Sequence, residues 1–199
     1  MFFELLRRYW GVIGLFLLMA FFGYFQGEAA LFMIVAASAV HEAGHLAAVG
    51  ILGGTVGFFS ASAGGLQIRA DSMRLSYLRE SAAVLAGPLA NLAVGLLLSS
   101  IPPAWPHSTG LAGANIALGI FNLLPAAPLD GWRFLQLALC WLMGPVNGSR
   151  TADFVGGVCA VFLAAGLLVL VVYSRGNLWL LPTAAAVMAS AANVFQKDL

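Results

Sequence analysis

Charged residues are scarce in this chain of 199 residues, at 9% of the total, whereas 61% of the residues are hydrophobic. Soluble domains carry about 25% charged residues, so the composition excludes an ordinary water-soluble fold. The nine basic residues form no dense patch, and nucleic acid is therefore not an expected partner. Cysteine is rare as well. Cys140 and Cys159 lie singly in apolar segments, which is typical of packing residues rather than of a disulfide or metal ligands.

Long apolar runs take the place of the missing charge, and several reach the roughly 20 residues that a helix needs to cross a bilayer. Six spanning segments are expected, at 9–25, 29–51, 81–101, 111–144, 154–173 and 178–194. The fourth is too long for one crossing, and Pro125 and Pro128 interrupt it because proline cannot continue a helix. The sequence therefore predicts an all-α polytopic membrane protein. A barrel is not expected, since hydrophobicity is continuous rather than alternating.

The stretch 53–80 is the one long polar part of the chain, and its glycines oppose a helix. Within it, Leu66-Gln67-Ile68-Arg69 alternates apolar and polar residues as a short strand would, with Gly64-Gly65 as a turn. A flexible linker explains the stretch equally well, so both interpretations stay open. A small sheet here would offer a free edge to an extended peptide.

Basic residues sort by side when the segments are taken in alternating directions. All but Arg175 fall on the side of the N-terminus: Arg7, Arg8, Arg69, Arg74, Arg79, Arg133, Arg150 and Lys197. Because cytoplasmic loops are enriched in Lys and Arg, this bias predicts that both termini and the stretch 53–80 are cytoplasmic.

The apolar segment 29–51 contains only three ionisable residues, His41, Glu42 and His45, in the pattern H-E-x-x-H. On a helix this spacing places two imidazoles on one face, where both can bind one Zn²⁺, with the glutamate as general base. Ionisable groups at membrane depth are costly, so they are functional candidates. The plainer alternative is a polar cluster that holds helices together by hydrogen bonds.

A catalytic zinc ion usually has three protein ligands, so two histidines leave the site incomplete. His107 falls in the loop on the opposite side of the membrane, and most acids lie at segment ends or in loops. Asp130 instead follows the two prolines within the long fourth segment. Counted along their helices, His41 and Asp130 both lie about 15–20 Å deep. Asp130 is therefore the candidate third ligand, although an acid that caps the following helix is the alternative.

Three motifs resemble those of the site-2 proteases, a family of intramembrane zinc metalloproteases. They are H-E-A-G-H at 41–45, A-G-P-L-A-N at 86–91 and N-L-L-P-A-A-P-L-D-G at 122–131, in the order of the family. The resemblance implies that His41, His45 and Asp130 bind one Zn²⁺. It further implies that Glu42 is the catalytic glutamate and that Asn122 lies near the scissile carbonyl. Asn91 and Pro88 are expected to shape their own helix rather than to contact substrate.

The resemblance also implies a single transmembrane metalloprotease domain over 1–199. Its catalytic core would be 29–144, with gating helices at 9–25 and 154–194. In size the chain is similar to the compact bacterial members, including a sporulation protease that processes a sigma-factor precursor. Trp132 stands where many relatives have a second glycine, which would narrow the cleft or change what enters it. No PDZ or CBS domain is expected.

The implied function is zinc-dependent hydrolysis of a peptide bond in or near a transmembrane segment of a regulatory protein. The expected partners are the lipid bilayer and a single-span membrane protein, such as an anti-sigma factor or a sigma-factor precursor. The expected location is a bacterial cell membrane, with the zinc site towards the cytoplasm. The sequence does not decide between a monomer and a homo-oligomer. Two other classes compete, a metal-binding transporter and a non-catalytic membrane binder. The single broken segment argues against the first, and Glu42 against the second.

Overall fold

The computed structural model describes residues 26–53, 55–62, 65–71, 76–102, 106–174 and 180–196. Its elements in chain order are α2 (Glu28–Ile51), β1 (Thr55–Ser62), β2 (Gly65–Asp71), α3 (Tyr77–Ser100), α4 (Ser108–Asn122), α5 (Asp130–Met143), α6 (Pro145–Tyr173) and α7 (Leu180–Gln196). The described chain is therefore helical apart from one pair of strands, as the sequence predicts. The expected first segment, 9–25, lies outside the described residues.

Among the described helices, α2, α3 and α6 are long and apolar enough to cross a membrane. The predicted long fourth segment is two helices, α4 and α5, of 15 and 14 residues. Two helices begin earlier than expected, α3 at Tyr77 and α6 at Pro145. The second difference has a local cause: Gly144, with φ 83°, ends α5, and a proline fits the first turn of the next helix.

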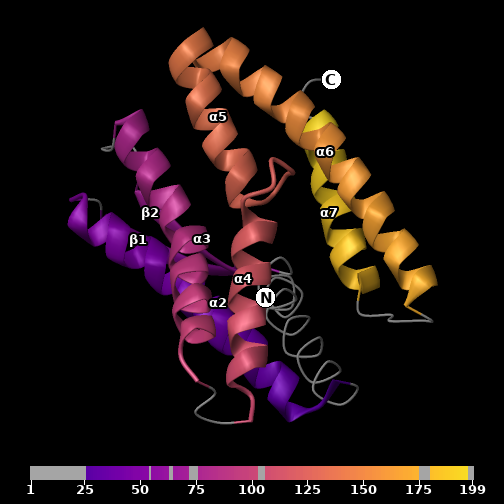
Figure 1. Ribbon diagram of the computed structural model, residues 1–199. Helices are drawn as coiled ribbons and strands as arrows, with labels where there is room; N and C mark the ends of the chain where they lie inside the picture. The colour runs from indigo at the N-terminus through magenta and orange to yellow at the C-terminus, as the bar shows by residue number, and fades with distance from the viewer. Residues whose placement is uncertain are drawn as a thin grey trace, which may run out of the picture.

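The helices form two groups with α5 between them (Figure 1). Helices α2, α3 and α4 pack together, α6 packs along α7, and α5 contacts both α3 and α6. Small residues allow the close packing of the first group. A β-carbon on Gly95 of α3, for example, would lie 2.6 Å from Ile116 and 3.0 Å from the Ala112 carbonyl oxygen, both in α4. Such contacts are typical of helix packing in membranes.

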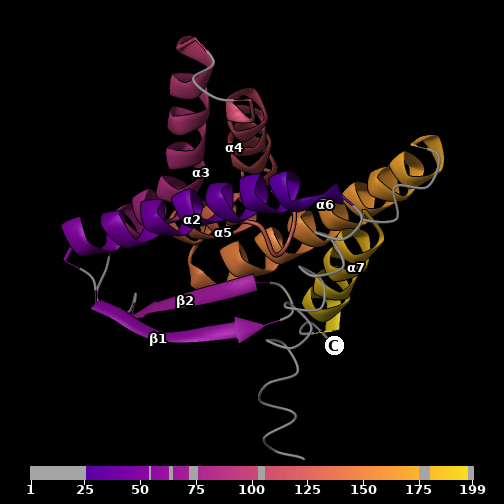
Figure 2. The same cartoon turned by 90° about the horizontal axis from the view of Figure 1, so that it is seen from below.

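Strands β1 and β2 pair antiparallel, from Thr55 opposite Asp71 to Ser62 opposite Gly65, with an irregularity between Val56 and Phe59. The predicted strand 66–69 thus lies inside β2, and the flexible-linker alternative is wrong. Gly65, expected in the turn, belongs to β2. The hairpin lies on the opposite side of α2 from α3 and α4 (Figure 2).

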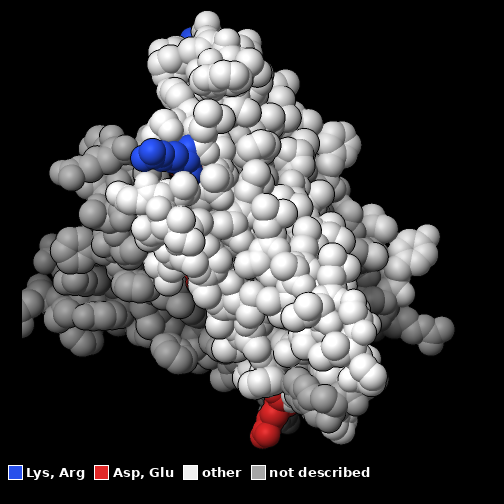
Figure 3. All heavy atoms as spheres, turned by 60° about the vertical axis from the view of Figure 1, so that its left-hand side comes forward, with Lys and Arg blue, Asp and Glu red and all other residues white. Residues whose placement is uncertain are grey.

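The surface is apolar and the interior is rich in small residues. Large side chains such as Leu97 (68% exposed) and Phe162 (73% exposed) point outwards, whereas the buried hydrophobic residues are mostly alanines. On the face in Figure 3, basic atoms lie in the upper part and acidic atoms at the lower end, with a surface between them that is uncharged except for one small acidic spot. This distribution suits a protein surrounded by lipid, where large apolar side chains need no burial.

The connection between α4 and α5 is fixed to the second group of helices. Ala126 belongs to a buried cluster with Ala160, Ala164, Val187 and Ala191 of α6 and α7. The backbone N–H of Ala127 donates a hydrogen bond to the carbonyl oxygen of Gly156 in α6, at 3.2 Å. Ala126 and Ala127 of the proline-containing loop are therefore buried in protein, whereas Pro125 and Pro128 on either side of them are exposed.

Gly44→Ala tests the contact between α2 and α3. The added β-carbon would lie 2.6 Å from the Ala86 carbonyl oxygen and 2.8 Å from the Ala90 β-carbon. Overpacking of this kind lowers the free energy of unfolding by about 1–3 kcal/mol, measurable by denaturant titration in detergent. Gly50→Ala is the matched control, because Gly50 lies in the same helix with nothing within 4 Å of the added atom. Equal stability of the two variants would contradict the close contact.

Candidate metal centre

Helix α2 carries the H-E-x-x-H residues in its second half, and helical spacing brings the rings of His41 and His45 to one face. His41 is 8% exposed, and the rings lie edge to face with centroids 4.7 Å apart. A glycine makes room for the second ring: a β-carbon on Gly87 of α3 would overlap the imidazole of His45. Gly87 thus allows α3 to pack directly against the histidine.

Asp130 reaches the histidines because the chain breaks before it. Helix α4 ends at Asn122, and α5 begins at Asp130 after the two prolines. Gly131 lets the start of α5 approach the end of α4, since a β-carbon there would overlap the carbonyl group of Leu123. The Asp-Gly pair therefore combines a ligand-type side chain with the only residue type that fits this crossing.

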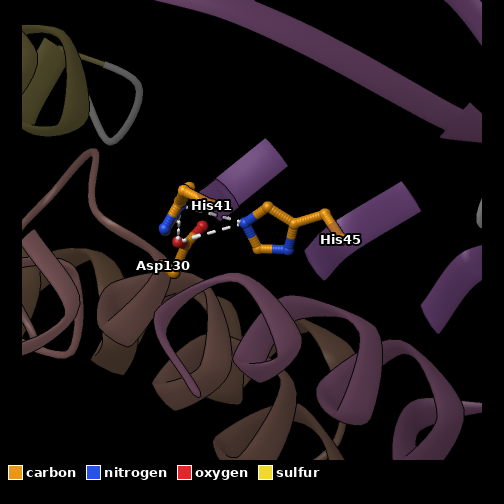
Figure 4. Close-up of side chains that lie close together, drawn as sticks. All are labelled: His41, His45 and Asp130. Carbon is orange, nitrogen blue, oxygen red and sulfur yellow. Dashed lines mark hydrogen bonds and ion pairs between the residues drawn. The ribbon is translucent and has the colours of Figure 1, made fainter. Parts of the chain in front are cut away.

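Three side chains from these two places converge on one point (Figure 4). Asp130 Oδ2 lies 2.9 Å from His41 Nε2 and 3.3 Å from His45 Nε2. The two Nε2 atoms are 3.1 Å apart. The carboxylate thus lies between the imidazoles, and one potential ligand atom from each residue lies within 4.8 Å of the others.

The second nitrogen of each imidazole already has a partner. His45 Nδ1 lies 2.8 Å from the carbonyl oxygen of Ala83, which can only accept, so this nitrogen carries the hydrogen. His41 Nδ1 lies 2.7 Å from the side-chain oxygen of Asn91 and likewise donates. In a neutral imidazole only one nitrogen is protonated. Both Nε2 atoms therefore present lone pairs towards Asp130.

This arrangement fits a metal ion. Two nitrogen lone pairs and a carboxylate oxygen face one another, and the buried Asp130 Oδ2 has no hydrogen-bond partner in the part of the chain described. A cation between them would turn this repulsion into coordination. In tetrahedral zinc sites, with metal–ligand bonds of about 2.0–2.1 Å, the ligand atoms lie about 3.3–3.4 Å apart, close to the separations seen here.

The remaining predicted site residues lie at different places. Glu42 is partly buried, and its carboxylate interacts electrostatically with both histidines and with Asp130. Asn122 is the last residue of α4, and its side-chain N–H donates to the Leu118 carbonyl oxygen one turn earlier, at 3.0 Å. Among the described residues, the potential metal-binding group joins His41, His45 and Asp130 without a further histidine or acid.

Trp132 follows the Asp130-Gly131 pair, and its side chain packs against α6. A β-carbon on Gly156 would overlap the indole ring, so the ring lies directly on the backbone of α6. Its indole nitrogen is buried and has no hydrogen-bond partner within the described ranges. The expectation that Trp132 narrows the cleft stays a prediction.

Two partners of the histidines are not apparent from the H-E-x-x-H pattern. Asn91, expected only to shape its own helix, holds His41, and the backbone of Ala83 holds His45. The motif A-G-P-L-A-N contains a usable indication, because Gly87 and Asn91 are four residues apart and therefore share one face of α3. That face is the one turned to the histidines.

Comparisons with known proteins agree with this geometry. No family model matches the chain. Over 92 residues it is 32% identical to a protein named zinc metalloprotease MJ0392 from Methanocaldococcus jannaschii. That alignment covers 42% of this chain and only 27% of the relative. Among solved structures, the chain is similar to a site-2 protease from the same organism, with a TM-score of 0.66 and 21% identity, over 92% of this chain and 86% of that one.

The chain has the fold of a site-2 protease. The resemblance predicted from the three motifs is therefore confirmed. Only 27% of the curated relative is aligned. The name of that relative therefore describes the relative and is not by itself a statement about this chain. In this chain the fold brings His41 and His45 of α2 together with Asp130 at the start of α5.

Gly87→Ala should weaken metal binding without abolishing the fold. The added methyl group would occupy space now filled by the His45 ring, so the ring must leave its position. Disturbing the orientation of a ligand typically lowers metal affinity about 10–100-fold, which competition with a chromophoric chelator measures. Gly113→Ala in α4 is the control, since its β-carbon meets nothing within 4 Å. Unchanged affinity in Gly87→Ala would show that the ring position is not required.

Proposed function

We propose that this protein is a zinc-dependent intramembrane endopeptidase. Its metal ligands are His41, His45 and Asp130, and its single ion is Zn²⁺. The observation that carries the proposal is the convergence of two imidazole lone pairs and one carboxylate at 2.9–3.3 Å inside an apolar helix group. Neutral imidazole and carboxylate ligands suit zinc, and the name of the curated relative supports the same metal.

Glu42 is the residue that moves the proton. It follows the first histidine directly, so its carboxylate interacts with all three ligands without replacing one of them. Zinc bound at the site would supply the Lewis acidity that peptide hydrolysis needs. Glu42 then takes a proton from the attacking water and delivers it to the nitrogen of the leaving amine, as a general base and then a general acid.

Asn122 is proposed to stabilise the negative charge that develops on the scissile carbonyl oxygen. It ends α4, directly before the loop that leads to Asp130. Its amide N–H now donates to Leu118 O within its own helix. The second amide hydrogen is the one that a substrate oxygen would use, because a primary amide donates twice.

The substrate is proposed to be a membrane-spanning segment of a single-span protein, such as an anti-sigma factor or a sigma-factor precursor. A peptide bond within a helix has its carbonyl hydrogen-bonded, so the segment must unwind locally before attack. The proposed domain is 1–199, with its catalytic core at 29–144 and gating helices at 9–25 and 154–194. Strands β1 and β2, which follow α2 directly, offer a free edge to the unwound peptide.

The proposed location is a bacterial cell membrane with both termini in the cytoplasm and the zinc site nearer that side. Three arginines in the described helices support it: Arg79, Arg133 and Arg150 are exposed and lie near the starts of α3, α5 and α6. Arg133 pairs with Glu80 in the first turn of α3. Ala83, which holds His45, lies only about 9 Å along α3 from its start, at 1.5 Å per residue. Water is therefore proposed to reach the site from this side.

Glu42→Gln separates the protease from its alternatives. The amide cannot take a proton from water, so cleavage of a fluorescent single-span substrate in detergent should fall about 10²–10⁴-fold. Bound zinc, measured by elemental analysis, should equal that of the wild type because the ligands are intact. A chelator should abolish wild-type cleavage and added Zn²⁺ should restore it.

Other outcomes favour other functions. Equal cleavage by wild type and Glu42→Gln would reject Glu42 as the base, and absence of zinc from both would reject the metal site. Zinc uptake into liposomes that contain the protein, without cleavage, would favour a transporter. Zinc binding with neither uptake nor cleavage would favour a non-catalytic binder.

Asn122→Ala tests the proposed oxyanion role separately. Loss of one such donor lowers kcat about 10²–10³-fold, while KM and zinc content should stay close to wild type. Ser99→Ala is a matched control, because Ser99 also donates to a carbonyl oxygen one turn earlier, Gly95 O at 2.8 Å. An unchanged kcat in Asn122→Ala would restrict Asn122 to its structural hydrogen bond.

A further inference from the structure

The hydrogen bonds that begin at His41 in α2 do not end at Asn91 in α3 but continue to α4 and back to α2. Asn91 Nδ2 donates to the backbone oxygen of Ala37 in α2, at 2.8 Å, and to Asn115 Oδ1 in α4, at 2.9 Å. Asn115 Nδ2 in turn donates to the Leu111 carbonyl oxygen, at 2.9 Å. Both asparagines are completely buried. They are also among the largest fully buried side chains of the described residues.

The direction of this chain of hydrogen bonds is fixed at its far end. A backbone carbonyl can only accept, so the Asn115 side chain must turn its nitrogen to Leu111 and its oxygen to Asn91. Asn91 then faces two acceptors, Asn115 Oδ1 and Ala37 O, and must present its nitrogen to both. Its oxygen is left for His41 Nδ1.

The reverse orientation is excluded by the same contacts. Turning the Asn91 amide over would set its oxygen against two acceptors and its nitrogen against an N–H group. All of these groups are buried, and no water-exposed surface of either asparagine could compensate. The orientation of the Asn91 amide, and with it the tautomer of the neutral His41 ring, is therefore imposed by two acceptors together, Ala37 O in α2 and Asn115 Oδ1 in α4.

We propose that Asn91 and Asn115 form a positioning relay for the metal site, an inference that rests on the proposed zinc function. The relay keeps the hydrogen of His41 on Nδ1 and holds the ring angle, so that the Nε2 lone pair points at the ion. Asn115 acts only through Asn91, because it reaches neither the ligands nor the ion. His45 needs no such relay, since a backbone carbonyl holds it.

The metal dissociation constant of the purified full chain tests the relay, measured with Zn²⁺ by chelator competition and with Co²⁺ by its absorption spectrum. Asn91→Leu removes the acceptor at similar volume and should weaken binding about 10–100-fold, the usual effect of losing a partner of a metal-binding histidine. Asn115→Leu should weaken it less, by about 3–10-fold on the same basis. The double variant should bind no more weakly than Asn91→Leu, because the two residues act in series.

A conservative variant separates positioning from packing. Asn91→Asp loses both donated hydrogen bonds, as Asn91→Leu does, but keeps an oxygen for His41 Nδ1, and carboxylate–histidine–zinc triads are common. Its zinc affinity and Co²⁺ spectrum should stay close to wild type, within about threefold. Ser99→Ala in the same helix is the control for a lost hydrogen bond from a side chain to a backbone carbonyl, and thermal unfolding of the metal-free proteins reports packing.

The outcomes distinguish failure of the relay from failure of the proposed zinc-protease function. Wild-type zinc affinity in Asn91→Leu and Asn115→Leu, with cleavage intact in the wild type, would overturn the relay and leave the protease standing. Equal weakness of Asn91→Asp and Asn91→Leu would also overturn it. A wild type without zinc would overturn the proposed function and the relay together. If Asn91→Leu does not fold, Asn115→Leu and Asn91→Asp decide.

Discussion

Mutual repulsion among three lone-pair atoms is the constraint on which this structure depends. Two imidazole nitrogens and a carboxylate oxygen lie 2.9–3.3 Å apart with no proton assigned between them. In an apolar interior such a group needs a positive charge between its atoms, which a bound metal ion supplies. The rest of the helix arrangement holds these atoms in place against their repulsion: α2 supplies the spacing, α3 supplies the partners of both rings, and the break between α4 and α5 supplies the acid. Chemistry and fold are thus specified by the same contacts.

Much of this centre is readable from local sequence, for physical reasons. A period of 3.6 residues puts His41 and His45 on one helix face wherever that helix is packed. Pro125 and Pro128 must interrupt a helix because they lack a backbone donor, which singles out Asp130 among the acids. Alternation of polar and apolar residues located β2. Each of these depends on neighbours within a few positions, so no tertiary structure was needed to predict it.

Other features depend on how helices rotate against one another, which local pattern does not encode. Asn91 was expected to shape its helix because the spacing of Gly87 and Asn91 shows that they share a face of α3, but not that this face meets His41. The partner of His45 is a backbone carbonyl, which every residue has, so Ala83 carries no sequence signature at all. Helices α3 and α6 begin earlier than the sequence predicts. Their first residues are less hydrophobic than the rest of each helix, so hydropathy does not mark them, although Tyr77 and Pro145 are compatible with a helix start. Asn122 could be located, but its partner Leu118 O could not.

Gly156 has a mechanical consequence. Its carbonyl oxygen accepts a hydrogen bond from the backbone N–H of Ala127, and its α-carbon, which has no side chain, contacts the ring of Trp132. One residue of α6 therefore contacts the chain on both sides of Asp130. These two contacts connect the chain around Asp130 to α6. A displacement of α6 that kept both contacts would carry the carboxylate with it, whereas the histidines belong to α2. The three ligands are thus divided between two groups of helices, with the acid attached to α6 and the imidazoles carried by α2.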